Sequence, residues 1–275
     1  MLRNQLNAWN EVDIDNIARE VYTVNTCVAA ARPLRPVGPE LERPRRTAEP
    51  APPTMTADDK PYHHGDLRRA LLDASLELLA ESGPQALTLR EVARRAGVSH
   101  AAPYRHFADK DELVAAVAEE GFATLRERML AAAAVARTSI EALERSGVAY
   151  VRLALEHPAH CAVMFGRVAS DLKQRRVETG SARLGASLDA GHAAYDGLVQ
   201  LVVAAQRDGF IRAGDPEEYA HIAWATVHGI ATLAMARMFE DDDERPWPDE
   251  LVLAFTERAV ANLSRGFAPD GRRPE

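Results

Sequence analysis

Between residues 87 and 113 the sequence is rich in side chains that donate hydrogen bonds, and these side chains lie on both sides of Gly97. Arginine, lysine, histidine, tyrosine and threonine are the side chains that bind phosphate oxygens and base edges in nucleic acids. The residues left for the outside of a short helix after Ser99 are His100, Ala101, Ala102, Tyr104 and Arg105. This pattern predicts a surface that binds a nucleic acid.

Apolar residues around Gly97 indicate how these donors are held. The predicted wedge between two short helices consists of Leu89, Val92, Val98 and Phe107. Ala93 is small enough to let the second helix cross closely, and Gly97 adopts the turn conformation without steric cost. Two short helices joined by a tight glycine turn indicate a helix-turn-helix, whose second helix enters the major groove of DNA.

The elements that position these residues are all predicted to be helical, because no stretch shows the two-residue alternation of a strand. Thr88–Glu91 and Asp109–Glu112 have the pattern of capping boxes. The expected helices run from Gly65 to Ser82, Thr88 to Ala96, Ser99 to Phe107, Asp109 through a long fourth helix, Ser139 to Glu156, Pro158 to Phe165, a long segment ending at Asp208, Asp215 to Phe239, and Pro248 to Gly266. The polar stretch 170–185 is expected to be partly loop.

The charge of the chain is unevenly distributed. Its formal net charge is −8, which by itself argues against a nucleic-acid partner. Residues 60–110, however, carry eight Lys and Arg against six Asp and Glu, whereas residues 111–275 carry 18 against 26. A basic module joined to an acidic one is typical of a DNA reader attached to a second domain.

The sequence divides into four predicted segments. Residues 1–59 form a proline-rich extension expected to be disordered, and residues 268–275 form a disordered tail. Residues 60–113 form the DNA-binding domain and residues 114–267 a larger helical domain. Met55 would make a natural start, so residues 1–54 are expected to be dispensable. No signal peptide or transmembrane stretch is found, and the two distant cysteines do not suggest disulfides, which predicts a cytoplasmic protein with no membrane partner.

The run from Tyr62 to Phe122 resembles the DNA-binding domain of the TetR/AcrR family of transcription regulators. The resemblance rests on four motifs in register, namely Thr88-x-Arg90-x-Val-Ala93, Ala96-Gly97-Val98-Ser99, Tyr104-x-His106-Phe107 and Lys110-Asp-Glu-Leu113. It implies an all-α fold in which a three-helix head is joined by a long fourth helix to a ligand-binding and dimerisation domain. Two later stretches, His157–Phe165 and Trp224–Gly229, resemble one branch of such C-terminal domains.

Roles follow from the matched positions. The resemblance implies that Thr88, Tyr104, His106 and Lys110 contact DNA phosphates, and Lys110 sits in the first turn of its helix, where exposed N–H groups also attract phosphate. The residues expected to reach base edges are Arg90, His100, Ala101 and Arg105. Pro103 occupies a position that a larger aliphatic residue often fills in the family, so the reading helix is expected to sit slightly differently.

The second domain is expected to supply a homodimer interface and an effector pocket. Apolar stripes in the last two helices could pack as a four-helix bundle between two subunits, or against their own subunit. The residues expected to line a pocket for a small hydrophobic or aromatic effector are Met129, Tyr150, Cys161, Met164, Phe165, Tyr195, Trp224 and His228. Effector binding would then shift the dimer away from the form that binds DNA.

A metal site and an enzyme are the main alternatives to this interpretation. His157, His160 and Cys161, or His221 with His228, could suggest a metal site, but the first group straddles a proline and the second lacks a third ligand. No nucleophile elbow or glycine-rich phosphate loop indicates an enzyme, so no catalytic residue, bound metal or cofactor is expected. The sequence thus predicts a repressor of a pseudo-palindromic operator, with a metal-sensing regulator or an activator as alternatives.

Overall fold

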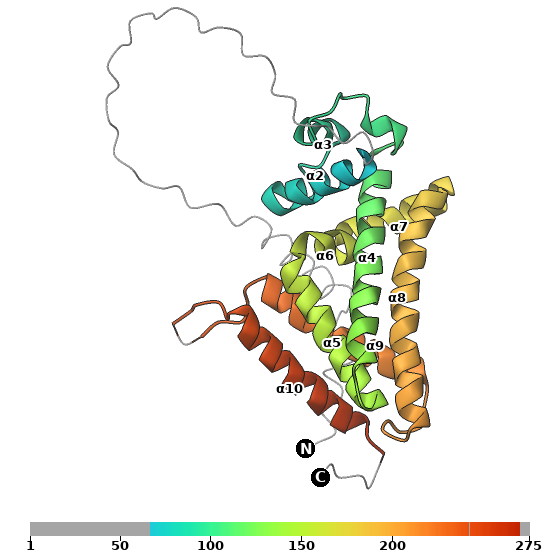
Figure 1. Ribbon diagram of the computed structural model, residues 1–275, viewed down its shortest axis with the longest axis vertical. Coiled ribbons are helices and arrows are strands. Elements are labelled where there is room, and N and C mark those ends of the chain that lie inside the picture. Colours follow the sequence, from blue (N-terminus) through green and yellow to red (C-terminus); the bar gives the residue numbers. More distant parts are fainter. Residues whose placement is uncertain (1–66, 242, 270–275) are drawn as a thin grey trace, which may run out of the picture. The chain divides into compact units, whose positions relative to one another are not determined.

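The computed structural model describes residues 67–241 and 243–269, and within these ranges the regular structure is helical (Figure 1). The elements are α2 (Leu67–Ser82), α3 (Leu89–Arg95), the 3₁₀ turn η2 (Pro103–Arg105), α4 (Lys110–Ala134), α5 (Ser139–Glu156), α6 (Pro158–Phe165), α7 (Arg167–Thr179), α8 (Ala182–Arg207), α9 (Pro216–Met235) and α10 (Asp249–Phe267). The predicted extension 1–59 lies outside the described residues, as does all of the tail beyond residue 269. None of the described helices is apolar over a stretch long enough to span a bilayer.

The head consists of α2, α3 and the segment that ends at Phe107. The predicted capping box is present, because the Thr88 hydroxyl accepts a hydrogen bond from Glu91 N at 3.1 Å. Gly97 has φ +69°, the left-handed conformation expected of the turn glycine. Val92 and Phe107 are buried together with leucines of α2, so the predicted wedge is largely correct.

The third helix of the head is shorter than expected. Residues 99–107 form turns and the single 3₁₀ turn η2 instead of an α-helix from Ser99 to Phe107. Pro103 has no N–H to donate to the carbonyl of Ser99, which accepts instead from Ala102 N at 2.9 Å. The proline therefore prevents the first α-helical hydrogen bond of this segment.

The long fourth helix, α4, leads from the head into the second domain (Figure 1). Its first turn is capped by Asp109, whose carboxylate accepts hydrogen bonds from Asp111 N and Glu112 N at 2.9 and 3.0 Å. Buried residues from Leu113 to Met129 then pack along the helix, so α4 continues without a break across the predicted boundary at residue 113. The two parts of the molecule therefore share one rigid element.

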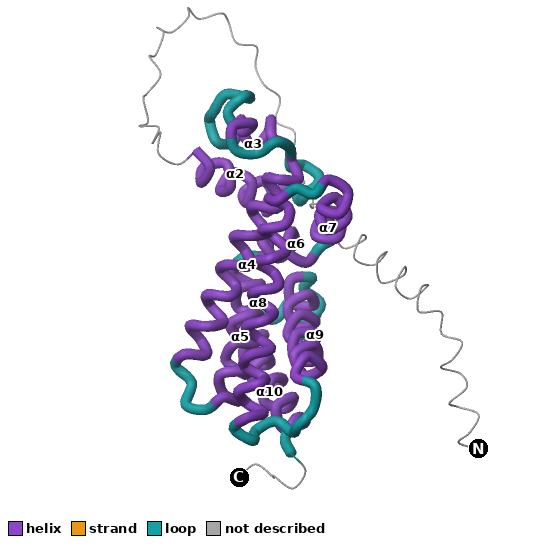
Figure 2. Tube along the Cα trace, turned by 90° about the vertical axis from the view of Figure 1, so that its right-hand side faces the viewer, coloured by secondary structure: helices purple, strands orange, loops and turns teal. Residues whose placement is uncertain are grey.

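The second domain is built around α5, which contacts α4, α6, α8, α9 and α10 (Figure 2). Its buried face includes Leu143, Tyr150 and Val151. Helix α8 packs along α4, and the short helix α6 lies against both α4 and α2. This arrangement places the end of the head in contact with the second domain through α2 and α4.

Helix α5 has the predicted bounds and is capped by Thr138, which accepts from Glu141 N. Two other segments differ from the prediction. The stretch expected to be partly loop is mostly the helices α7 and α8, which Gly180 separates with φ +64°. Helix α9 ends at Met235 rather than Phe239, because Arg237 adopts a left-handed conformation and Met238 N bonds to Leu233 O, a Schellman-type end.

Candidate DNA-binding surface and ligand cavity

The residues predicted to read bases lie on the surface of the head. Arg90 lies in the first turn of α3, while His100, Ala101 and Arg105 belong to the turns after Gly97, and all four are exposed. Tyr104 is 62% exposed although its neighbour Pro103 and nearby Phe107 are buried. An aromatic side chain held in water beside a packed core is available to contact another molecule.

The other predicted phosphate ligands are also close to this surface. The Thr88 hydroxyl is occupied as an acceptor by the α3 cap, but its own proton stays free to be donated. Lys110 donates one hydrogen bond from Nζ to Pro84 O at 3.0 Å, which holds the ammonium group beside the loop that precedes α3. His106 is partly buried at the end of η2.

The neighbouring arginines of α3 have structural partners. Arg94 bonds to Glu91 on its own helix, with Nε to Oε2 at 2.9 Å. Arg95 reaches α2, where it bonds to Glu81 at 2.7 Å and to Glu77 at 3.3 Å. This hydrogen-bonded guanidinium holds the pKa of the Glu81 carboxyl below its usual value. Arg95 therefore joins α3 to α2.

Ion pairs connect the start of α4 to α7 and α8. Arg175 of α7 bonds to Asp109 at 3.0 Å and also pairs with Asp111. Arg183 of α8 lies 3.8 Å from Glu112 and places its guanidinium 5.8 Å from the centre of the Phe107 ring. The segment that follows the turn glycine is thus in direct contact with the second domain.

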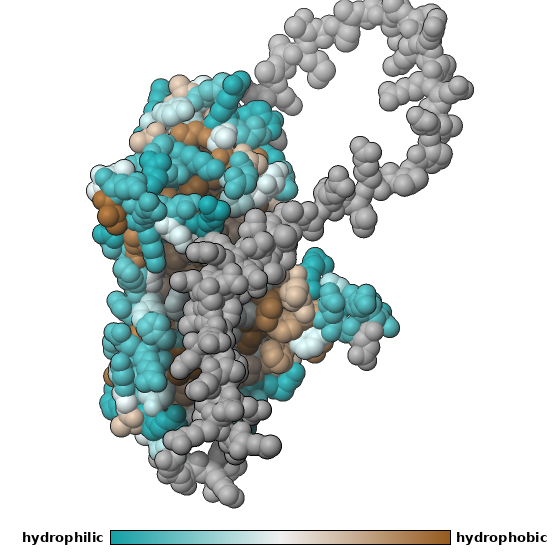
Figure 3. Space-filling view, turned by 180° about the vertical axis from the view of Figure 1, so that it is seen from behind, coloured by the Kyte–Doolittle hydropathy of each residue, from teal (hydrophilic) through white to brown (hydrophobic). Residues whose placement is uncertain are grey.

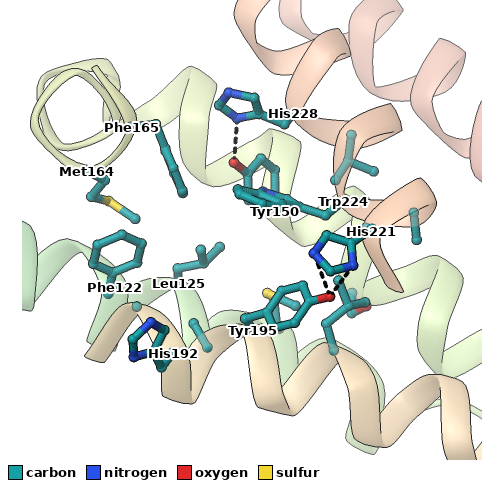
Figure 4. Close-up of a pocket in the computed structure, with 18 of the residues that line it drawn as sticks. Phe122, Leu125, Tyr150, Met164, Phe165, His192, Tyr195, His221, Trp224 and His228 are labelled. Carbon is teal, nitrogen blue, oxygen red and sulfur yellow. Dashed lines mark hydrogen bonds between the residues drawn. The ribbon is translucent and has the colours of Figure 1, made fainter. Parts of the chain in front are cut away.

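A cavity of about 610 Å³ lies inside the second domain (Figure 4). Its volume is in the range that binds small molecules. Its walls come from α4, α5, α6, α7, α8, α9 and α10. Of the residues predicted for a pocket, those that line it are Met129, Tyr150, Met164, Phe165, Tyr195, Trp224 and His228.

Cys161 is the exception among these residues. It is buried on α6 but does not line the cavity, so its assignment to the pocket was wrong. Its helix faces the cavity through Met164 and Phe165 instead. Burial raises the pKa of the Cys161 thiol to about 11, so the group stays protonated and behaves as a small core residue.

A tyrosine–histidine pair lies on the inner wall of the cavity. The Tyr150 hydroxyl on α5 and His228 Nδ1 on α9 are 2.9 Å apart (Figure 4). Burial raises the pKa of Tyr150, despite an opposing contribution from the Trp224 side chain that is hydrogen-bonded to it. Burial also lowers the pKa of His228. Both groups are therefore neutral near pH 7.

A second pair lies on the exposed side of the cavity. The Tyr195 hydroxyl on α8 is 2.8 Å from His221 Nδ1 on α9. His221 is exposed, and Tyr195 is partly buried. Other exposed lining residues are Ser170 and Lys173 of α7, His192 of α8, and Glu217 of α9. The cavity is thus apolar within and polar toward solvent.

Sequence reasoning missed part of the wall. Ala118, Phe122 and Leu125 of α4 line the cavity together with Met129, a spacing of three or four residues that marks one helix face. That stripe is visible in the sequence, but it is equally typical of a helix buried in a core. His192 and His221 were also missed, because their positions on the cavity depend on how α8 and α9 pack.

The histidine groups considered as metal sites do not gather ligands. Among the described residues no three His, Cys, Asp or Glu side chains are placed to hold a metal ion. His157 instead bonds to Arg128 at 3.0 Å, and its ring packs edge-on against His160. His221 and His228 each bond to a tyrosine.

Comparison with known proteins gives consistent matches over both domains. Residues 71–117 match a family model of bacterial regulatory proteins of the tetR family, and residues 143–260 match a tetracyclin repressor-like C-terminal domain. An HTH-type transcriptional repressor of Mycobacterium tuberculosis is 36% identical over 106 residues, which are 38% of this chain and 56% of that protein. The chain thus spans little more than half the length of this curated relative.

Solved structures extend the match beyond the head. A protein of unknown function from Rhodococcus sp. RHA1 is 36% identical, with a TM-score of 0.61, over 76% of this chain and all of that one. A tetR-family regulatory protein from Rhodococcus RHA1 is 20% identical, with a TM-score of 0.56, over 73% of this chain and 96% of that one. The tetR-family regulatory protein from Rhodococcus RHA1 therefore shares the fold of this chain.

Proposed function

The chain belongs to the TetR family of transcription regulators, and from this premise we propose that it binds a pseudo-palindromic operator as a homodimer, represses transcription, and is released by a small hydrophobic or aromatic effector. The observation that carries the proposal is that one helix, α4, begins beside the exposed donors of the head and also lines the cavity of the second domain. The repressor named among the relatives favours repression over activation.

The exposed donors are proposed to contact two different parts of the DNA, the phosphate backbone and the base edges. Tyr104, Thr88 and Lys110 are proposed to hold the phosphate backbone, which sets the register of binding but little sequence preference. Arg90 and His100 are proposed to reach base edges, where an arginine can bond to both acceptors of guanine. His106 is proposed to contact the phosphate backbone as well, and Arg105 is proposed to contact base edges.

Dimerisation is proposed to use α9 and α10. The outer face of α9 presents Ile222, Ala225 and Leu233, and beyond it Leu251 of α10 is exposed. Gly229 lies on the same helix with open space where a side chain would begin, so another helix could approach closely there. Apolar side chains gather next to the loop 236–248 that joins the two helices (Figure 3). Exposed apolar faces of this kind commonly mark protein interfaces.

The dimer is tested by light scattering after size exclusion. Ile222→Glu places a charge on the proposed interface and is expected to yield monomers, because an unpaired buried charge is costly. Val177→Glu on α7 is the matched control, since Val177 is 85% exposed and lies away from α9 and α10. A wild-type protein that elutes as a monomer at all concentrations contradicts the proposal.

Release is proposed to pass through α4 and α6. Gly121 of α4 leaves room for Met164, whose sulfur would lie only 2.5 Å from a side-chain carbon at position 121. Arg69 of α2 bonds to Glu120 of α4 at 2.7 Å, beside this contact. A ligand that moves Met164 or Phe122 would therefore shift helices that also hold the head.

DNA binding is tested by gel shift with the DNA upstream of the chain's own coding sequence. Tyr104→Ala is expected to weaken binding to all duplexes by a similar factor, because it removes a backbone contact. Arg126→Ala is the control, since Arg126 is exposed on α4 far from the head surface. Unchanged binding by Tyr104→Ala would overturn the assignment, and absence of any shift with wild-type protein would overturn the function.

A further inference from the structure

Three of the side chains that α9 presents to the cavity are aromatic and share one helix face. His221, Trp224 and His228 are separated by three and four residues, which places them one above another on a helix. Each histidine bonds to a tyrosine from a different helix, His221 to Tyr195 of α8 and His228 to Tyr150 of α5. The cavity therefore has a hydrogen-bonding pair at each end of an indole ring (Figure 4).

Each pair keeps hydrogen-bonding capacity beyond its own bond. The Trp224 side chain also bonds to Tyr150, and His221 Nδ1 also lies 2.7 Å from Glu217 O. The tyrosine hydroxyls and His228 Nε2 remain able to bond to a ligand. Within the part of the chain that the structure describes, no charged residue is bonded to the inner pair, and burial holds both of its members in their neutral forms. A hydroxyl or a carbonyl group of a ligand would satisfy such a pair without bringing charge into the interior.

The space between the pairs is walled by rings. Phe165 packs edge-on against Phe122 at a centroid distance of 5.4 Å and lies 6.2 Å from Trp224. Tyr195 meets Trp224 edge-on at 6.1 Å. Rings set at these angles can contact both the face and the edge of a flat aromatic ligand.

The charges on the wall disfavour an anion in the interior. The only ammonium or guanidinium group among the lining residues is Lys173, which is exposed on α7. The carboxylates of Glu144 and Glu217 also line the cavity. A ligand carboxylate buried beside Tyr150 would lose its hydration without gaining a cation, which is strongly unfavourable.

The spacing of the two histidines along α9 gives the approximate length of the ligand. His221 and His228 are seven residues apart, or about 10 Å along the axis of α9 at 1.5 Å per residue. The geometry points to an uncharged, rigid aromatic effector that carries a hydroxyl or carbonyl group at each end, about 10 Å apart. This inference rests on the proposed function and names the chemical class that the same cavity takes.

The test compares three probes of equal framework by isothermal titration calorimetry. Biphenyl-4,4′-diol carries hydroxyl groups at both ends of a rigid biphenyl, whereas biphenyl itself lacks them and biphenyl-4,4′-dicarboxylate replaces them with charges. The diol is expected to bind at least about 5-fold tighter than the other two, because two neutral hydrogen bonds each contribute roughly 0.5–1.5 kcal/mol. Equal binding of diol and biphenyl, tighter binding of the dicarboxylate, or no binding of the diol overturns the inference.

Two variants assign the binding to the pairs. Tyr150→Phe and Tyr195→Phe should each weaken the diol about 3- to 10-fold while leaving biphenyl unchanged, since only one hydrogen bond is lost. Tyr219→Phe is the control, because Tyr219 bonds to Arg212 and does not line the cavity. If both variants bind the diol like the wild type, the pairs are not its ligands and the inference fails.

Failure of this inference can be separated from failure of the proposed function. The same protein preparation is tested by gel shift on its upstream DNA, with and without the diol. Binding to DNA together with no binding of the diol overturns only the ligand class. No binding to DNA, with tight binding of the diol, overturns the proposed function and leaves the ligand class supported.

Discussion

The two regions of the molecule hold their sites in opposite ways. In the head, the proposed DNA ligands lie within residues 88–110 and stand exposed on a small packed core. In the second domain, the cavity is lined by residues from Ala118 to Phe267 on seven helices. A site made of adjacent residues has a signature that can be seen in a sequence, whereas a site made by packing depends on every helix that surrounds it.

The difference also determines whether a substitution changes function alone or changes function and stability together. Removing an exposed side chain of the head should weaken DNA binding at little cost to folding. A side chain of the cavity wall is also part of the core, so its removal affects folding and ligand binding together.

The largest effect is expected where two neighbouring aromatics of the head are compared. Phe107→Ala should lower the free energy of unfolding by about 3–5 kcal/mol, because Phe107 is 1% exposed and its loss leaves a cavity. Tyr104→Ala should change it by less than about 0.5 kcal/mol, since Tyr104 is exposed. Urea denaturation of both variants measures the difference, and similar losses would show that Tyr104 is also a core residue.

A smaller effect is expected for base recognition. Arg90→Ala should reduce discrimination against a substituted guanine in the operator by about 1–3 kcal/mol, because a bidentate contact is lost. Fluorescence anisotropy with matched and substituted duplexes measures this loss of discrimination.

Lys110→Ala should instead weaken binding to every duplex and reduce the slope of log K against log salt by about 1. A Lys110→Ala slope equal to that of the wild type contradicts the phosphate assignment.

The contact between the two regions should matter more for regulation than for stability. Arg175→Ala removes ion pairs of α7 with Asp109 and Asp111, and their exposure limits the loss of folding free energy to less than about 1 kcal/mol. The same change should alter the effector concentration that releases DNA. An unchanged release curve would show that coupling does not pass through this contact. Arg167→Ala, an exposed arginine at the start of α7, is the control.

The smallest effect concerns pH. Burial lowers the pKa of His228 in the folded chain, so the unfolded chain binds a proton more readily. The resulting destabilisation is absent above about pH 6.5, the pKa of histidine in the unfolded chain. It grows as the pH falls from there toward the lower pKa of His228 in the folded chain. The thermal midpoint should therefore be lower at about pH 5.5 than at about pH 7.5, and His228→Gln should reduce this difference. His160, whose pKa burial also lowers, contributes a part that persists in the variant.

How far the sequence predicts the structure differs between the regions. In the head, caps and the turn glycine are local signals, and Thr88, Asp109 and Gly97 behave as expected. Pro103 is unusual at its position in the sequence, but this alone does not predict the loss of a backbone hydrogen bond that shortens the third helix. The polar composition of α7 concealed a helix whose few buried contacts include Leu172.

In the second domain, residue types identified much of the wall but not its organisation. Large aromatic and sulfur-containing side chains on apolar helices lie inside in any packing, which explains why Phe165 and Trp224 were found. The hydrogen bonds of Tyr150 and Tyr195 to histidines of α9 join residues 78 and 26 positions apart, and no local pattern encodes such pairings. Cys161 was misplaced because helix phase alone does not say which neighbour a buried face meets.

The most direct test of the central claim is hydroxyl-radical footprinting of the wild-type protein on its upstream DNA. Two heads that each present the segment after Gly97 to a major groove should protect two related clusters of sugars. These clusters should lie on one face of the duplex, one helical turn or a whole multiple apart, about 10 base pairs per turn. Saturating effector should remove both clusters together. A single protected cluster, or two clusters on opposite faces, would contradict the account.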